Sequence, residues 1–304
     1  MAPATAKAAD RFVQFFGFVF HTISNRVGHD VAGNRHRYIP WKMLRDYWTA
    51  VEIHALLYDN FELHVDVGVV QEQYLRIFST LVFGGPSAVQ HFKELFINYG
   101  ITDEKLPLLE RPGAWMGIDC WIDDYCAGLS PNQWQFFPLP FDRDHLQDCD
   151  IGPGRILPID PPVQLWQGGC AVVKRIVVHD DHQHLAKRCF VLKTYDELSE
   201  SLYKRELEAY RRLNHQPSAN LLQFFGSFRQ LGSCSLVLEY VDGGNLEEFL
   251  DKTPPPTTSE DVAMFWANLF KALNGLDRIH QIVPYEDGEV IMGYVEILSV
   301  SEVD

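Results

Sequence analysis

The sequence of 304 residues lacks any apolar run long enough to cross a membrane. A transmembrane helix needs about 18 consecutive apolar residues, and the longest candidate, Phe12 to Ile23, is short and interrupted by Gln14, Gly17 and His21. No small-residue cleavage pattern follows this stretch, which argues against a secretory signal. We therefore expect neither a membrane-spanning nor a secreted protein.

Cysteine is scarce as well. The six cysteines are spread along the chain without a C-x-x-C pair, which fits neither a disulfide framework nor a zinc site and is typical of a reducing compartment. We expect a cytoplasmic or nuclear protein. A mitochondrial presequence is the alternative, because Lys7, Arg11 and Arg26 are accompanied by a single acid, Asp10, near the amino terminus.

Basic side chains are outnumbered: 26 Lys and Arg stand against 41 Asp and Glu, a formal net charge of −15 at pH 7. Such a field repels phosphate backbones and anionic lipids, so we expect no nucleic-acid partner and no membrane partner. The composition, 46% hydrophobic and 22% charged, is that of a globular protein. The length predicts about two domains.

Residues 1–150 indicate a mainly helical domain with an irregular, aromatic-rich segment from Leu106 onward. Apolar residues recur at helical spacing over Trp41 to Leu57 and over Tyr74 to Val82. Gly84-Gly85-Pro86 should end the second helix, and Ser87 should cap a third. The core is expected to include five tryptophans: Trp41, Trp48, Trp115, Trp121 and Trp134.

After Pro162 the pattern changes to strands. The β-branched and aromatic runs and the turn residues predict, in order, strands over Val172 to Val178 and Arg188 to Tyr195, a helix over Glu197 to Leu213, strands over Leu221 to Phe228 and Ser233 to Val241, a helical turn over Asn245 to Leu250 and a long amphipathic helix over Ser259 to His280. Between the first two strands, His179, His182 and His184 are expected in a solvated loop, with metal binding as the alternative.

Two charges fall on surfaces that should be apolar. Glu206 shares a helix face with Leu202, Tyr210 and Leu213, and Lys193 alternates with apolar residues along a strand. A buried carboxylate without a cationic partner costs several kcal/mol. We therefore predict an internal ion pair between Lys193 and Glu206.

This pair resembles the lysine and glutamate with which protein kinases place nucleotide phosphates. The strand Phe190-Val-Leu-Lys193 resembles the family's V-A-I-K, and Leu236-Val-Leu-Glu-Tyr-Val241 resembles its hinge. Leu213-Asn-His215 and the helix ending at His280 fit the same order. The resemblance to the Ser/Thr-type protein kinases covers residues 157–281. The helical amino-terminal region and the segment Trp134-Gln-Phe-Phe-Pro-Leu-Pro-Phe141 ahead of it resemble fungal kinase-domain proteins. These resemblances imply an α+β fold: a helical amino-terminal domain, a kinase small lobe made of an antiparallel sheet with one helix, and the first helices of the large lobe.

The resemblance also implies an ATP site. Lys193 would reach the phosphates, held by Glu206, while the backbone of Glu239 and Val241 would meet the adenine edge. The remaining members of the implied site are Gly168 and Gly169 in the phosphate loop, Val173 and Val191 as the roof, Leu238 as gatekeeper and Asn245 near the ribose.

Two departures weaken the kinase pattern. The phosphate loop reads Leu165-Trp-Gln-Gly-Gly-Cys-Ala-Val-Val173, with Trp166 and Ala171 in place of two glycines, which should loosen nucleotide binding. After His280 the sequence contains neither H-R-D-x-x-x-x-N nor D-F-G. Without these aspartates we expect no phosphoryl transfer and no Mg²⁺ site, and a regulatory, scaffolding or residual role.

The domains expected are thus 1–150, a partial kinase-like domain at 157–281 and an atypical tail at 282–304. An interrupted large lobe should leave apolar surface on the helix 259–280, so a protein partner is expected to cover it. Two alternatives stay open: a fragment of an active Ser/Thr-type kinase, or a protein-interaction module in residues 1–150.

Overall fold

The structure is a computed structural model that describes residues 6–23, 26–118, 121–182, 185, 187–214, 220–243 and 246–280. The chain forms two compact units, each assembled from separate stretches of sequence. Unit 1 comprises Met1–Phe141, Ile151–Pro161 and Val178–His184, and unit 2 comprises Asp142–Asp150, Pro162–Val177 and Leu185–Asp304. The division into 1–150, 157–281 and 282–304 stays a prediction, and the last range lies outside the described residues.

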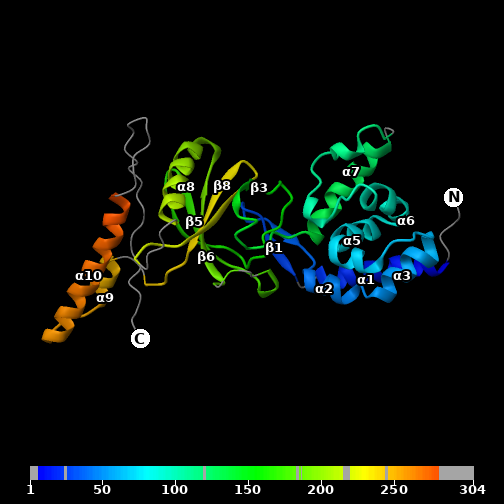
Figure 1. Cartoon of the computed structure of the whole chain (residues 1–304). Coiled ribbons are helices and arrows are strands. Elements are labelled where there is room, and N and C mark those ends of the chain that lie inside the picture. Colours follow the sequence, from blue (N-terminus) through cyan, green and yellow to red (C-terminus); the bar gives the residue numbers. More distant parts are fainter. Residues whose placement is uncertain are drawn as a thin grey trace. The chain divides into compact units, whose positions relative to one another are not determined.

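Unit 1 is mainly helical, as expected (Figure 1). Its α-helices are α1 (Ala6–Ile23), α2 (Trp41–Tyr47), α3 (Ala50–His54), α4 (Val67–Gln73), α5 (Leu75–Gly84), α6 (Pro86–Val89) and α7 (Trp121–Gln133). Shorter helical segments are η1 (Ala55–Asn60), η2 (Lys93–Ile97), η3 (Asp103–Lys105), η4 (Gly113–Trp115), η5 (Trp134–Phe136) and η6 (Asp180–His182). Strands β1 (Val27–His29) and β2 (Arg35–Arg37) pair as an antiparallel hairpin.

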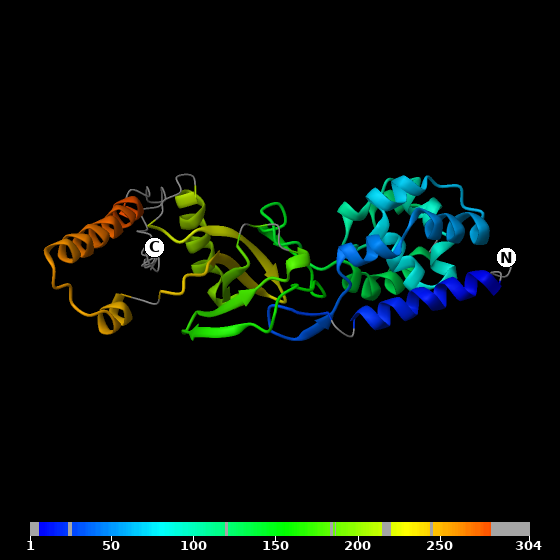
Figure 2. The same ribbon diagram turned by 90° about the horizontal axis from the view of Figure 1, so that it is seen from below.

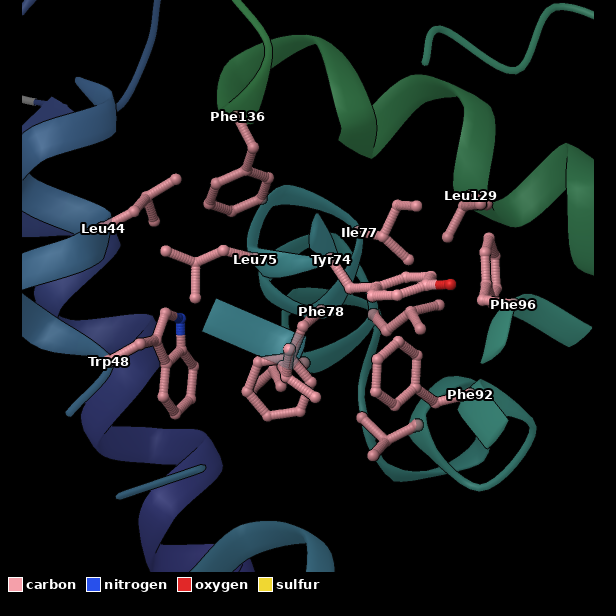
Figure 3. Packing of buried hydrophobic residues seen from close by; sticks show 14 of the residues in the cluster. Leu44, Trp48, Tyr74, Leu75, Ile77, Phe78, Phe92, Phe96, Leu129 and Phe136 are labelled. Atoms are coloured by element: carbon pink, nitrogen blue, oxygen red, sulfur yellow. The ribbon is translucent and has the colours of Figure 1, made fainter. Parts of the chain in front are cut away.

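Helix α5 lies in the middle of the unit 1 core (Figure 3). The ring of Phe78 contacts Trp48 on one side, at 4.8 Å between ring centres, and Phe92 on the other, at 5.6 Å. The indole of Trp48 donates a hydrogen bond to the Ser79 hydroxyl at 3.0 Å. A buried indole N–H needs such a partner, which explains a buried serine on this helix.

Four of the five tryptophans belong to this core. Trp48 and Trp115 are buried, and Trp41 and Trp121 pack against the core while partly exposed. Trp134 instead packs closely on Gly154, where an added Cβ would lie 2.3 Å from the indole nitrogen.

Several local predictions for unit 1 are wrong. The helix expected over Trp41 to Leu57 ends at Tyr47, and Thr49 caps a new helix by accepting a hydrogen bond from the Glu52 amide at 3.3 Å. Ser87 does not cap α6, which begins at Pro86 immediately after Gly85. The aromatic-rich segment contains a helix of 13 residues, α7, in place of purely irregular structure.

Unit 2 is built around a sheet of six strands in the order β3-β7-β8-β6-β5-β4 (Figures 1 and 2). The strands are β3 (Gln147–Asp150), β4 (Val163–Gln167), β5 (Ala171–Val177), β6 (Cys189–Tyr195), β7 (Phe224–Gln230) and β8 (Ser233–Glu239). Neighbouring strands are antiparallel except β3 and β7, which are parallel. The helical segments are η7 (Glu197–Ser199), α8 (Glu200–Asn214), α9 (Leu246–Lys252) and α10 (Ser259–His280).

This arrangement confirms the predicted α+β fold class and the order of its elements. The long helix has the predicted bounds, and strands β5, β6, β7 and β8 lie within three residues of theirs. Strands β3 and β4 were not predicted, because Gln147–Asp150 is polar and Val163–Gln167 was interpreted as part of a loop. None of the described helices is long and apolar enough to span a bilayer.

Helix α8 packs on the sheet through a face different from the predicted one. Tyr203, Leu207 and Tyr210 are buried against the sheet, whereas Leu202 is 41% exposed. The buried face therefore begins at Tyr203 and not at Leu202, with its apolar residues at i, i+4 and i+7. Glu206 lies at the edge of the buried face and not in its middle, with its side chain 14% exposed.

Candidate functional site

The predicted ion pair is present. Lys193 lies on β6, inside the sheet, where it is opposite Val173 of β5 and Leu236 of β8. Its ammonium donates to both carboxylate oxygens of Glu206, each at 2.9 Å, and the two side chains are 16% and 14% exposed. A bidentate contact between two largely desolvated groups fixes the lysine head, since removing either partner would leave a charge without compensation.

Tyr195 adds a second donor to the same carboxylate. Its hydroxyl donates a short hydrogen bond to Oε2 of Glu206, and its ring centre lies 5.6 Å from the Lys193 ammonium. Burial, together with the Glu206 charge, raises the pKa of Tyr195, so the hydroxyl keeps its proton and remains a donor. Tyr195 is not among the predicted site residues, although the strand alternation puts it on the same side as Lys193.

The two loop glycines lie in the connection between β4 and β5. The Gly168 amide donates to the Ala171 carbonyl at 3.0 Å, which closes the hairpin. An added Cβ at Gly168 would lie 2.0 Å from the Trp166 ring, whereas the same atom at Gly169 would meet nothing within 4 Å. Gly168 is therefore needed for close approach of the Trp166 ring, a role that the sequence analysis did not foresee.

The remaining predicted site residues lie around the same strands. Leu238 and Val173 are buried, and Leu238 is paired with Val191 across β6 and β8. The backbone N–H of Glu239 donates to the Gln223 carbonyl at 2.8 Å, and its side chain forms an ion pair with Lys187. Val241 follows β8 and is half-buried.

The roles that these residues would have toward a nucleotide stay predictions. Asn245 lies outside the described residues.

The histidine-rich connection is not a solvated loop, so that prediction is wrong for the two histidines that the structure describes. His182 is 2% exposed. Nδ1 of His179 is hydrogen-bonded to the Tyr38 hydroxyl at 2.5 Å, and its Nε2 donates to the Asp160 carboxylate at 3.2 Å. Both rings pack on Tyr38. Within the described residues no group of three or more His, Cys, Asp or Glu is arranged to hold a metal ion, and His184 lies outside them.

The comparisons with known proteins point to one family. Residues 162–286 match the family model described as protein kinase domain. Myosin light chain kinase 3 of Homo sapiens is 33% identical over 78 residues, which cover 26% of this chain and 9% of that protein. Inactive tyrosine-protein kinase 7 of Homo sapiens is 35% identical over 82 residues, covering 24% of this chain and 7% of that protein.

The chain thus spans less than a tenth of these two relatives. Among solved structures, the crystal structure of Rad53 1-466 in complex with AMP-PNP aligns with a TM-score of 0.31 and 22% identity, over 41% of this chain and 30% of that chain.

Proposed function

We propose that the chain binds ATP at the Lys193 site of a small lobe and does not transfer its phosphoryl group, since residues 162–286 match the family model described as protein kinase domain. Lys193 meets the phosphates, and the Val173 and Val191 side chains cover the adenine ring. The backbone of Glu239 and Val241 meets the adenine edge.

One observation carries this proposal: the contact of the Lys193 ammonium with both oxygens of Glu206 at 2.9 Å. A buried ion pair adds little net stability, because apolar residues of similar volume often stabilise a fold as well or better. A purely structural role therefore does not explain a lysine on a central strand. Protein kinases use such a lysine–glutamate pair to present a cation to the phosphates, which supports the same role for Lys193 and Glu206.

The proposal that the chain does not transfer a phosphoryl group is argued from its sequence. Phosphoryl transfer requires an aspartate beside the accepting hydroxyl and another on Mg²⁺, and the residues after His280 include neither motif; the nearest string is Tyr285-Glu-Asp287. The function is then regulatory or scaffolding. The alternative is that this chain is a piece of an active Ser/Thr-type kinase. The names of the relatives support either case, since one is a kinase and the other an inactive kinase.

Calorimetric titration with ATP, with and without Mg²⁺, tests the binding. We expect saturable binding that Lys193→Ala weakens by at least about tenfold, roughly 1.4 kcal/mol. Lys204→Ala is the matched control, because it removes an exposed lysine of α8 that pairs with Glu200. Absence of binding by the wild-type chain at millimolar ATP, or equal binding by Lys193→Ala, would refute the proposed site.

Transfer is tested separately with γ-labelled ATP and a general protein acceptor. We expect no label above background in wild type. Transfer that Lys193→Ala abolishes would show that the chain is catalytically active and would favour the alternative of an active kinase.

A further inference from the structure

Residues 142–150 belong to unit 2, although the stretches before and after them belong to unit 1. Strand β3 adds to the free edge of β7 in parallel, with Gln147 opposite Ser227 and Asp150 opposite Arg229. The pairing is irregular between Gln147 and Cys149, and Asp148 has a φ of 54° there. A non-glycine residue in this region is held against a cost of order 1 kcal/mol or more, so its surroundings must favour the conformation.

Those surroundings are side-chain contacts from two other elements. The Asp148 carboxylate accepts from the Tyr203 hydroxyl of α8 at 2.5 Å and from Nε of Arg229 on β7 at 3.3 Å. Arg211, also on α8, lies 3.7 Å from the other carboxylate oxygen. Asp148 is 19% exposed and Tyr203 is fully buried. One carboxylate therefore joins the sheet edge to two points along α8.

The position of α8 determines whether Glu206 can reach Lys193. Tyr203 and Glu206 are three residues apart, so they occupy the same turn of the helix. A bidentate contact at 2.9 Å depends on the angle of the carboxylate as well as its distance. A shift of this turn by about an ångström would lose one or both bonds, because hydrogen bonds weaken steeply beyond about 3.2 Å.

We propose that Asp148 is a positioning residue, which holds α8 through Tyr203 in its first turn and Arg211 in its last turn so that Glu206 meets Lys193. The inference rests on the proposed function for its consequence in nucleotide binding. The geometry of the pair can be tested without nucleotide. The buried face of α8 also holds the helix, so loss of Asp148 loosens the pair and does not abolish it.

Asp148→Gly removes the carboxylate while allowing the positive φ without strain. Asp148→Asn is the conservative variant, because asparagine also tolerates this region and keeps one acceptor oxygen for Tyr203. Tyr203→Phe removes the hydroxyl alone. Leu44→Ala, a cavity variant in the core of unit 1, serves as the stability control.

The first readout is the rate at which an amine-reactive ester modifies Lys193 in the nucleotide-free chain, followed by peptide mass spectrometry. We expect Asp148→Gly and Tyr203→Phe each to raise this rate about threefold or more, and the double variant to raise it little further, because both act on one contact. Asp148→Asn should restore most of the protection. Leu44→Ala should leave the labelling rate of Lys193 unchanged. The labelling rate of Lys204 should be the same in every variant.

The second readout is ATP affinity, measured below the unfolding range of every variant. We expect Asp148→Gly to weaken binding about threefold to tenfold. If wild type does not bind ATP, the proposed function fails while the labelling result still decides the role of Asp148. Equal labelling of Lys193 in wild type and Asp148→Gly would overturn the positioning role. So would an increase that Leu44→Ala reproduces.

Discussion

Lys193 and Glu206 are 13 residues apart in sequence and meet with two hydrogen bonds. The sequence could predict this contact because Lys193 interrupts the apolar alternation of its strand and needs a compensating carboxylate. Glu206 supplies it from the edge of the buried face of α8 and not, as predicted, from its middle. The same reasoning did not find Asp148. Its segment is polar and short, and nothing in the sequence shows that it adds to a sheet edge much further along the chain, where Gln147 is opposite Ser227 and Asp150 opposite Arg229.

At the same scale, Asp30 is a buried carboxylate in the β1–β2 turn, 3% exposed. It accepts from the Asn34 amide at 2.8 Å and contacts Nε2 of His36 at 3.0 Å. Burial alone would raise the pKa of Asp30, but the hydrogen bonds from His36 and Asn34 outweigh it and hold the pKa below its usual value. The ionised form therefore stabilises the fold.

This sets a pH dependence. Because the pKa of Asp30 is lower in the folded than in the unfolded chain, its stabilisation is present above the ordinary carboxyl value of about 4 and is lost as the pH falls through the lower folded value. We expect Asp30→Asn to lower the free energy of unfolding by about 2 kcal/mol at pH 7. That difference should shrink below pH 4, as measured by urea denaturation.

Asp124→Asn, at an exposed position of α7, is the matched control for Asp30→Asn. A difference between wild type and Asp30→Asn that stays constant from pH 7 to pH 3 would contradict the prediction.

At the scale of elements, prediction succeeded where the local sequence pattern was strong. The Thr258 hydroxyl caps α10 by accepting from the Asp261 amide at 3.1 Å, and the predicted bounds of this helix are confirmed. α7 was missed because its apolar residues do not form one stripe and Pro131 lies inside it. The break after Tyr47 was missed because Thr49 starts a new helix with apolar residues that continue the earlier spacing.

A substitution at Gly226 tests whether the pairing of β3 with β7 helps to hold α8. An added Cβ at Gly226 would lie 2.2 Å from the Leu146 carbonyl oxygen, too close for β3 to stay in place. We expect Gly226→Ala to displace β3 and to raise Lys193 labelling as much as Asp148→Gly does, while leaving the Asp148 side chain intact.

Gly128→Ala is the control for Gly226→Ala, because an added Cβ there meets nothing within 4 Å. Alanine favours a helix over glycine by about 1 kcal/mol, so this variant should be slightly more stable and label normally. Unchanged Lys193 labelling in Gly226→Ala would show that β3 does not hold α8.

At the scale of the whole molecule, α10 is notable for its large exposed apolar side chains. Trp266 is 50% exposed, Phe270 58% and Leu273 51%, within the part of the chain that the structure describes. Apolar side chains gathered on one helix favour association with another protein surface. This is the basis for the partner expected at residues 259–280, which remains a proposal.

Sedimentation velocity tests that surface. We expect the wild-type chain to associate as its concentration rises, and Phe270→Gln combined with Leu273→Gln to remain monomeric at concentrations about tenfold higher, because the variant loses apolar area. Asn274→Gln, exposed on the same helix, should behave as wild type. A monomeric wild-type chain at high concentration would contradict self-association.

The two units exchange segments of the chain, and this has a consequence for fragments. A protease cut between Asp150 and Ile151 would put β3 on the first piece and its neighbour β7 on the second. In unit 1 the same cut separates His29 from Leu157, whose backbones exchange two hydrogen bonds of 2.9 and 2.7 Å. The two fragments of the cleaved chain should therefore elute together in gel filtration until urea separates them. Neither fragment should be soluble when it is expressed without the other.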